Sequence, residues 1–245
     1  TVKCKLYFAE ESKVIVETGA KLIVDGGYLT NTNTSDCSGE EKLWGGIEVW
    51  GQSNLSQFQN NQGEVILKQG AVIEYAEEGV QNWRYNHYNE TGGIIRAYNC
   101  TFRNCKRAVA FYKYENYYNG NLYNDKSVFQ DCQFILDDDF PLSQPHGMAS
   151  LWNTYGVHFF SNDFIDERSN ASAPYGIKSI DAYMIVNGQC NAPISGGCNS
   201  VDYGTFENFK IAIDALDAST NNTIRIDRNQ FTNNEVGVKI SAIDE

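Results

Sequence analysis

The segment VHFFSNDF, residues 157–164, recurs as IRIDRNQF at residues 224–231, and this repeat decides the fold. In both segments a β-branched residue lies seven positions before a Phe, an apolar residue five before it and an Asn two before it. A second half follows the Phe: FRNCKRAVAF at 102–111, FENFKIAIDA at 206–215 and FTNNEVGVKI at 231–240. Each places Asn two positions after the Phe, a small residue six after it and a β-branched residue seven after it. Such recurrence predicts an array of equivalent structural units.

The repeat is anchored by one large apolar residue, and successive anchors lie roughly 25 to 40 residues apart. The anchors are Ile73, Phe102, Phe134, Phe164, Phe206 and Phe231. The intervals hold short alternating runs and turn residues but no amphipathic helix. Repeated short strands separated by bends predict a parallel β-helix. In this fold each strand pairs with its equivalent one turn away, and the paired strands lie about 4.8 Å apart. We therefore expect the Phe anchors to stack in one internal column.

Asn suits the bends, because its amide hydrogen-bonds to local backbone and its backbone tolerates left-handed φ. Cys100 and Cys132 occupy the slot that Asn162 and Asn229 take in later repeats, which predicts a ladder shared by Cys and Asn.

The N-terminal third carries a related pattern that is less rich in Asn. It contains KVIVETGAKLIVDGGYLTN (13–31), LWGGIEVWGQ (43–52) and GEVILKQGAVIEYAEEGV (63–80), with Gly at the bends. Alternate residues of these runs would face a core. We predict an all-β fold, a right-handed single-stranded parallel β-helix of about eight coils with long loop excursions. We expect it to form a single domain over residues 1–245 and to be a segment of a longer secreted protein.

These runs, with GGIIRAYNCTFRNCKRAV at 92–109, resemble the parallel β-helix domains of Bacteroidota-type secreted proteins exported by the type IX secretion pathway. The most specific elements are W-G-G-I-x-V-x-G at Trp44–Gly51 and G-x-V-x-L-x-x-G-A-x-I at Gly63–Ile73. The resemblance covers most of the chain and implies a pectate-lyase-like β-helix and export. Most members of this group have no assigned chemistry, so the resemblance implies fold and export route rather than activity.

Composition limits the partners. The chain has 245 residues, 42% of them hydrophobic, and a formal net charge of -12. An acidic surface repels phosphate backbones and anionic headgroups, so we expect no nucleic-acid partner. No apolar run approaches the roughly 20 residues that span a bilayer, so we expect no membrane insertion. Binding of an anionic polymer would need a local basic patch or bridging cations.

Cysteine placement favours an oxidising compartment. Cys190 and Cys198 bracket the loop CNAPISGGC, whose Gly, Pro and Asn let a short loop close, so we predict a disulfide there. Cys4 and Cys37 form a second candidate pair. We expect a secreted or cell-surface protein.

Two tyrosine-rich excursions, NWRYNHYNETG and YKYENYYNGNLYND, are the strongest binding signal. Aromatic faces flanked by Asn amides suit sugar rings, which offer C–H faces for stacking and hydroxyls for hydrogen bonding. The alternative is that the rings pack on each other to hold the loops. The candidate ligand-binding residues are Trp83, Tyr85, His87, Tyr88, Tyr112, Tyr114, Tyr117, Tyr118 and Tyr123.

Signals for catalysis or a cofactor are weak. Asp137, Asp138 and Asp139 form an acidic run that could hold calcium or simply begin a solvated loop, because no D-x-D-x-D-G spacing fixes a coordination shell. A lyase could use this run with Arg168 or Arg225, and a hydrolase would need N-x-D, D-D, G-H-G and R-x-K motifs that the sequence lacks. We expect no cofactor other than calcium.

Three functions stay open at this point. The first is a secreted or cell-surface β-helix scaffold of adhesin-like character, which binds glycans or other surface ligands through aromatic loops. The second is a polysaccharide lyase or glycoside hydrolase of the same fold. The third is a structural spacer or filament component joined to flanking domains of the same longer protein.

Overall fold

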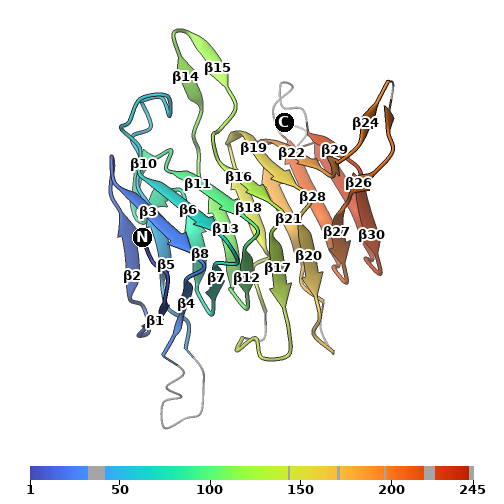
Figure 1. The fold of residues 1–245 in the computed structure, drawn as a ribbon, viewed down its shortest axis with the longest axis horizontal. Coiled ribbons are helices and arrows are strands. Elements are labelled where there is room, and N and C mark those ends of the chain that lie inside the picture. The colour runs from blue at the N-terminus through green and yellow to red at the C-terminus, as the bar shows by residue number, and fades with distance from the viewer. Residues whose placement is uncertain (33–41, 143, 170–171, 196, 218–223, 243–245) are drawn as a thin grey trace.

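The computed structural model describes residues 1–32, 42–142, 144–169, 172–195, 197–217 and 224–242. Within these ranges the regular structure is entirely β, and most of it lies in three long parallel sheets, here called A, B and C. Figure 1 shows their strands stacked along the long axis, from the N-terminal coil to the C-terminal coil.

Each sheet takes one strand from each turn of the chain. Sheet A contains β3 (Lys21–Asp25), β6 (Glu64–Lys68), β11 (Ile94–Tyr98), β16 (Val128–Gln130), β19 (Tyr155–Phe160), β22 (Tyr183–Asn187) and β29 (Arg225–Asp227). Sheet B contains β1 (Lys5–Phe8), β4 (Tyr28–Asn31), β7 (Val72–Glu74), β12 (Thr101–Arg103), β17 (Gln133–Leu136), β20 (Asp163–Asp166), β27 (Gly204–Glu207) and β30 (Asn229–Thr232). Sheet C contains β2 (Lys13–Val16), β5 (Gly46–Val49), β8 (Glu78–Gln81), β13 (Arg107–Phe111), β18 (Ala149–Trp152), β21 (Tyr175–Ile180), β28 (Ile211–Asp217) and β31 (Val236–Ala242).

The chain visits the sheets in the order A, B, C, so β6, β7 and β8 form one complete coil. Sheets B and C have eight strands each, which confirms the predicted parallel β-helix of about eight coils. In the first coil sheet A is reduced to a bridge between Val2 and Val24.

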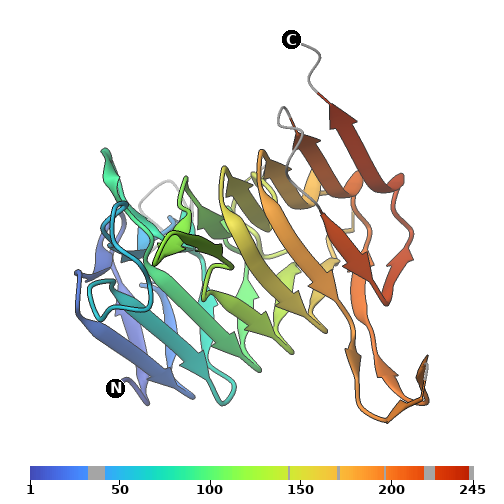
Figure 2. The same cartoon turned by 90° about the horizontal axis from the view of Figure 1, so that it is seen from above.

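Within the described residues, four short antiparallel strand pairs project from the coils, the last two of them in a single excursion. They are β9 (Trp83–Arg84) with β10 (His87–Thr91), β14 (Asn116–Tyr118) with β15 (Asn121–Tyr123), β23 (Gln189–Cys190) with β26 (Val201–Asp202), and β24 (Pro193–Ile194) with β25 (Gly197–Cys198). Figure 2 shows the last of these extending away from the C-terminal half of the stack.

The predicted aromatic column is confirmed. The rings of Phe102 and Phe134 stack at 5.0 Å between centroids, and Phe164 follows at 4.4 Å. Phe206 lies 4.7 Å beyond Phe164, and Phe231 lies 5.3 Å beyond Phe206. Each ring belongs to the strand of sheet B that pairs in register with the one before it. One residue per coil therefore builds a continuous inner wall.

Asn residues make the corners between sheets B and C, as the repeat predicts. Asn104, Asn208 and Asn233 have φ values of 50°, 68° and 55°, in the left-handed region that Asn adopts more readily than most residues. Their backbone turns the chain sharply between a strand of sheet B and the next strand of sheet C.

The ladder shared by Cys and Asn is also confirmed. Strand register aligns Cys100, Cys132, Asn162 and Asn229, with Gly204 between the two Asn residues. A Cβ at Gly204 would overlap Oδ1 of Asn229, so Gly at this position leaves room for the amide where it lies.

Asn162 shows what the ladder contributes to stability. Its side chain is buried, Oδ1 accepts from the Cys132 backbone N–H at 2.9 Å, and Nδ2 donates to the Phe129 carbonyl at 3.0 Å. Asn162→Ala leaves both backbone groups without these partners, so we expect a loss of about 2 kcal/mol in the free energy of unfolding, measured in urea. The exposed Asn121→Ala is the control, and an equal loss from both would contradict a role for the ladder.

Within the described ranges, no helix is long and apolar enough to cross a membrane.

Candidate functional site

Three long excursions leave the coils at the same corner, where sheet C passes to the next strand of sheet A. They connect β5 to β6, β8 to β11 and β13 to β16, in three successive coils. Together, residues 50–63, 82–93 and 112–127 form what we call the loop face. Figure 1 shows its hairpins, β10 and β14–β15, at one edge of the molecule.

The loop face is fixed by buried polar contacts between excursions. Oδ1 of Asn116 accepts from the Ser56 hydroxyl at 2.9 Å and from the Gln57 backbone N–H at 3.0 Å. The Tyr114 hydroxyl donates to the Leu55 carbonyl at 2.8 Å, and the Tyr114 side chain is only 2% exposed. Tyr114 was expected to bind ligand; its burial makes it a structural residue that ties the two excursions together.

Tyr112 is the centre of a packed aromatic cluster. Its ring centroid lies 5.9 Å from Trp83, 5.1 Å from Tyr88 and 4.8 Å from Trp152. The packing interpretation therefore holds for Tyr112 and Trp83, which are both partly buried. Tyr88 belongs to this cluster and yet remains 56% exposed, so part of its surface faces solvent.

Beside this cluster lies a hollow of about 270 Å³, here called the tyrosine hollow. Tyr88 and Tyr117 line it from two different hairpins and are 56% and 52% exposed. The remaining lining residues are Ser53, Asn89, Lys113, Tyr114 and Glu115. The structure thus brings three predicted tyrosines, two exposed and one buried, together with amide, hydroxyl and charged groups that line the same space.

A second group of rings surrounds Phe58. Tyr118 lies 5.3 Å from Phe58 and Tyr123 lies 5.0 Å from it, both between ring centroids. Adjacent residues of a strand point to opposite sides, so Tyr117 faces the tyrosine hollow while Tyr118 faces Phe58. Hairpin β14–β15 therefore separates two aromatic surfaces.

The two remaining candidates lie outside the tyrosine hollow. Tyr85 is 59% exposed, with Nζ of Lys13 4.9 Å from its ring centroid. His87 is exposed and lies 3.7 Å from the carboxylate of Glu90. Both occupy the β9–β10 hairpin.

The acidic run does not form a cation site. Asp137 accepts from Nδ2 of Asn104 at 2.6 Å, and Asp138 accepts from the Ser169 backbone N–H at 2.8 Å. These contacts to Ser169 hold the pKa of Asp138 below its usual value. The carboxylates thus diverge, and no group of three or more His, Cys, Asp or Glu in the described part of the chain could hold a metal ion. Asp137, Asp138 and Asp139, the calcium candidates, are therefore not part of such a group.

Arg168, a candidate base for a lyase, is held in an ion pair with Asp166. Its Nε and Nη2 donate to the two carboxylate oxygens of Asp166, both at 2.8 Å, and both side chains are buried. An Arg held in this bidentate pair is a structural element of the B-to-C corner.

A carboxylate-lined hollow of about 310 Å³ lies across the turns between sheets A and B. Asp131, Asp163 and Asp202 line it. Burial raises the pKa of Asp163, and the charge of Asp202 acts in the same direction. The lining contains no Lys or Arg among the described residues, so neither Arg168 nor Arg225, the candidate bases for a lyase, contributes to this hollow.

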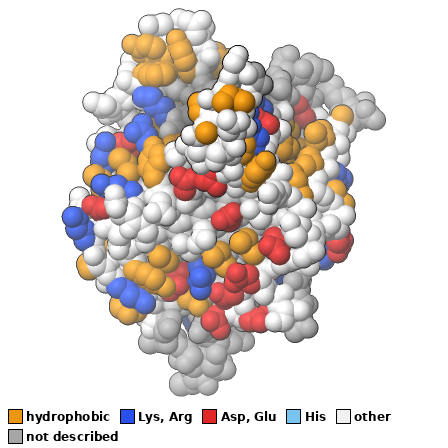
Figure 3. Space-filling model, turned by 45° about the vertical axis from the view of Figure 1, so that its right-hand side comes forward, with side chains coloured by type: hydrophobic (Ala, Val, Ile, Leu, Met, Phe, Trp, Pro, Cys, Tyr) orange, Lys and Arg blue, Asp and Glu red, His pale blue; other side chains and the backbone are white. Residues whose placement is uncertain are grey.

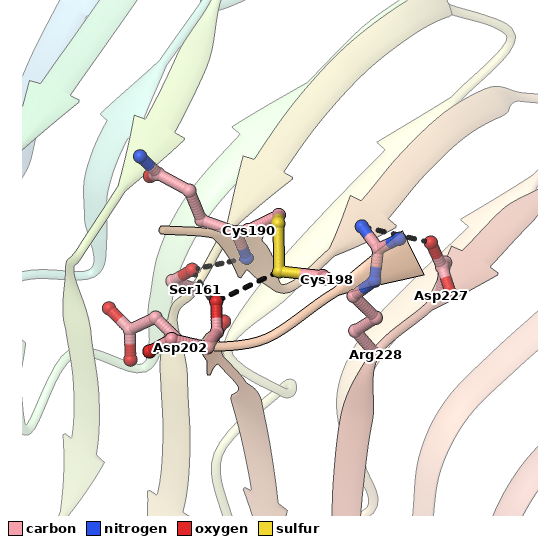
Figure 4. The surroundings of a disulfide bond; sticks show 8 residues. Ser161, Cys190, Cys198, Asp202, Asp227 and Arg228 are labelled. Carbon is pink, nitrogen blue, oxygen red and sulfur yellow. Dashed lines mark hydrogen bonds and ion pairs between the residues drawn. A yellow bond between two sulfur atoms is a disulfide. The ribbon is translucent and has the colours of Figure 1, made fainter. Parts of the chain in front are cut away.

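The predicted disulfide between Cys190 and Cys198 is present, with Cα atoms 5.9 Å apart. Figure 4 shows it beside Ser161, whose hydroxyl accepts from the Gln189 N–H at 2.9 Å and donates to the Asp202 carbonyl at 2.9 Å. Cys4 is exposed, and its candidate partner Cys37 lies outside the described residues, so the second pairing stays a prediction.

Sequence reasoning missed several contributors to the loop face. Phe58, Trp152, Ser53 and Lys113 were not among the candidates, although each contacts a ring or lines a hollow. The amide-rich run SNLSQFQNNQ at 53–62 carried a signal, because it interrupts the repeat at the same corner as the two tyrosine-rich excursions.

Comparison with known proteins gives little beyond this geometry. No family model matches the chain, and no curated protein matches it. Among solved structures it is similar to the Streptococcus pneumoniae surface protein and adhesin PfbA, at 13% sequence identity and a TM-score of 0.44. The match covers 98% of this chain and 65% of that chain. The parallel β-helix assignment rests on the strand pairing described above.

Proposed function

We propose that this protein is a secreted or cell-surface β-helix of adhesin-like character that binds glycans on its loop face. One observation carries the proposal: Tyr88 and Tyr117 expose their rings to a single hollow from two neighbouring excursions. Ring faces stack on the C–H faces of sugars, and the nearby Asn89 and Ser53 can hydrogen-bond to hydroxyls.

Two further features support the proposal. The contacts of Asn116 and Tyr114 hold the excursions in place before a ligand arrives, which reduces the entropy lost on binding. The Cys190–Cys198 disulfide fits an oxidising compartment, in line with secretion. Export by the type IX pathway stays a prediction from the sequence resemblance.

The test is binding of the chain to immobilised galactan, mannan, β-glucan and polygalacturonate. Tyr117→Ala and Tyr88→Ala should each weaken retention of whichever glycan binds by on the order of tenfold, because each removes a stacking face. Tyr117 has no packed ring partner among the contacts described above, so its substitution is the cleaner of the two.

Tyr7→Ala is the matched control, because Tyr7 is 59% exposed but lies on β1, in the first coil. Equal retention by all three variants would overturn the proposal. The same incubations distinguish the other functions: ultraviolet-absorbing or reducing products would indicate a lyase or hydrolase, and no retention of any glycan would favour a spacer.

A further inference from the structure

The chain is strongly acidic, yet one hollow is cationic. Figure 3 shows acidic side chains spread over the middle and lower part of one face, with basic ones gathered towards one side. The formal net charge is -12. Against this background a hollow of about 410 Å³ is lined by three basic residues, Lys21, Arg96 and Lys126, and by one acidic residue, Glu64.

The floor of this cationic hollow is the outer face of sheet A. Val65 and Ile95 point into the core, so Glu64 and Arg96, one position away on β6 and β11, point outward. Nη1 of Arg96 lies 2.9 Å from Glu64, and Lys21 on β3 pairs with the other oxygen of the same carboxylate. One carboxylate thus serves two cations.

Lys126 brings the third positive charge from the excursion that carries the tyrosines. Its Nζ donates to the Gln57 carbonyl at 3.1 Å and lies 4.3 Å from the Phe58 ring centroid. No carboxylate among the described residues pairs with it. Burial, and then the charge of Arg96, lower the pKa of Lys126, while the charge of Glu64 acts in the opposite direction.

The rest of the lining suits a sugar rather than a bare anion. Gln59 and Asn60, both exposed, offer amides that donate to and accept from hydroxyl groups. The Phe58 ring lies beside the Lys126 ammonium group and packs against Tyr118 and Tyr123. It offers a stacking surface for a sugar ring. A volume of about 410 Å³ lies within the usual range for small-ligand sites, roughly 300–1,000 Å³.

We infer that the cationic hollow is a subsite for a carboxylated sugar residue, whose carboxylate lies between Lys126 and Arg96. The inference rests on the proposed glycan binding and adds the chemical class of the ligand. Hairpin β14–β15 separates this subsite from the tyrosine hollow, so one extended acidic glycan would contact both sides of the hairpin.

The experiment compares probes that differ by a carboxylate, with affinities measured by calorimetry. Trigalacturonate is compared with its carboxyl-reduced form, and sialyllactose with lactose, which distinguishes a uronic from a sialic source of the same group. The unmodified chain should bind one of the carboxylated probes on the order of tenfold more tightly than its neutral counterpart, and added salt should reduce the difference.

Lys126→Gln should remove this preference by weakening binding of the carboxylated probe far more than that of the neutral one, whereas Lys126→Arg should keep it. Lys68→Gln is the matched control, because Lys68 points outward from the other end of β6 and pairs with Asp25 at 3.6 Å. Thermal unfolding of each variant confirms that the fold is retained.

The outcomes separate the two proposals. Neutral probes that bind as tightly as carboxylated ones, or an unchanged preference in Lys126→Gln, would overturn the subsite and leave glycan binding standing. Tyr117→Ala should weaken both kinds of probe, because it acts in the tyrosine hollow. Absence of binding by every probe would overturn the subsite alone if the chain is retained by one of the immobilised glycans, and both proposals if it is retained by none.

Discussion

Phe164→Ala is expected to lower the free energy of unfolding by about 4 kcal/mol, the usual cost of removing a fully buried ring. Phe164 has no exposed surface and lies between Phe134 at 4.4 Å and Phe206 at 4.7 Å. Its removal leaves a void with a ring above and a ring below, and paired strands on both sides prevent the wall from collapsing into it. Urea unfolding measures the loss.

A Phe at the end of the column provides the control for Phe164, which lies inside it. Phe231 contacts only one ring of the column, that of Phe206, and is 37% exposed, so Phe231→Ala should cost about 1 kcal/mol. Phe164→Leu, which keeps most of the volume, should fall between the two. A loss at Phe164 no greater than that at Phe231 would contradict the idea that the stack of rings stabilises the helix.

The column of Phe rings could be predicted from sequence, because residues that stack in space in a β-helix recur at equivalent positions of successive repeats. Each coil contributes one inward residue two positions after the Cys or Asn of the ladder, as in Phe134 after Cys132 and Phe164 after Asn162. Insertions of different length between coils do not disturb this local spacing. The corners followed for the same reason, since Asn104 and Asn208 lie two positions after their Phe.

Whether an individual tyrosine ring of the excursions is buried or exposed could not be predicted in the same way. Tyr114 and Tyr117 lie three residues apart in one tyrosine-rich run, yet one is buried and the other is half exposed. The difference arises because the Tyr114 hydroxyl meets the carbonyl of Leu55, which is 59 residues earlier in the chain. No local pattern records a contact between two insertions.

The cationic hollow could not be predicted from the sequence for a related reason. Lys21, Arg96 and Lys126 come from three coils, separated by insertions whose lengths follow no repeat. Only strand register, which places Lys21 opposite Glu64 and Glu64 opposite Ile94, brings these charges to one side of sheet A. A sequence scan sees isolated basic residues in an acidic chain.

Glu78, a half-buried acid in the B-to-C corner, predicts how stability depends on pH. Burial raises the pKa of Glu78 from 4.5 to about 7, and nearby Arg107 only partly offsets this. The Arg107 Nε lies 3.6 Å from Oε2 of Glu78, and neither atom has a hydrogen-bond partner among the described residues. The pair is therefore too poorly arranged to compensate for the removal of the carboxylate from water.

The folded state consequently binds more protons than the unfolded state between pH 4.5 and about 7. The free energy of unfolding should fall as the pH rises through this window and then level off. At about 1.4 kcal/mol per pKa unit, and allowing for the 23% exposure of the side chain, the contribution of Glu78 is about 2–3 kcal/mol.

Glu78→Gln removes this titration, because Gln resembles the protonated acid at every pH. The variant should match the unmodified chain near pH 4 and exceed its stability by about 2–3 kcal/mol at pH 8. The difference between the two chains, taken from urea unfolding at each pH, isolates Glu78 from the other carboxylates. Glu77→Gln is the control: Glu77 is 45% exposed and pairs with Lys106 at the surface, so its substitution should change stability by less than about 0.5 kcal/mol at either pH. A difference at pH 8 no larger for Glu78→Gln than for Glu77→Gln would show that the corner accommodates the ionised carboxylate.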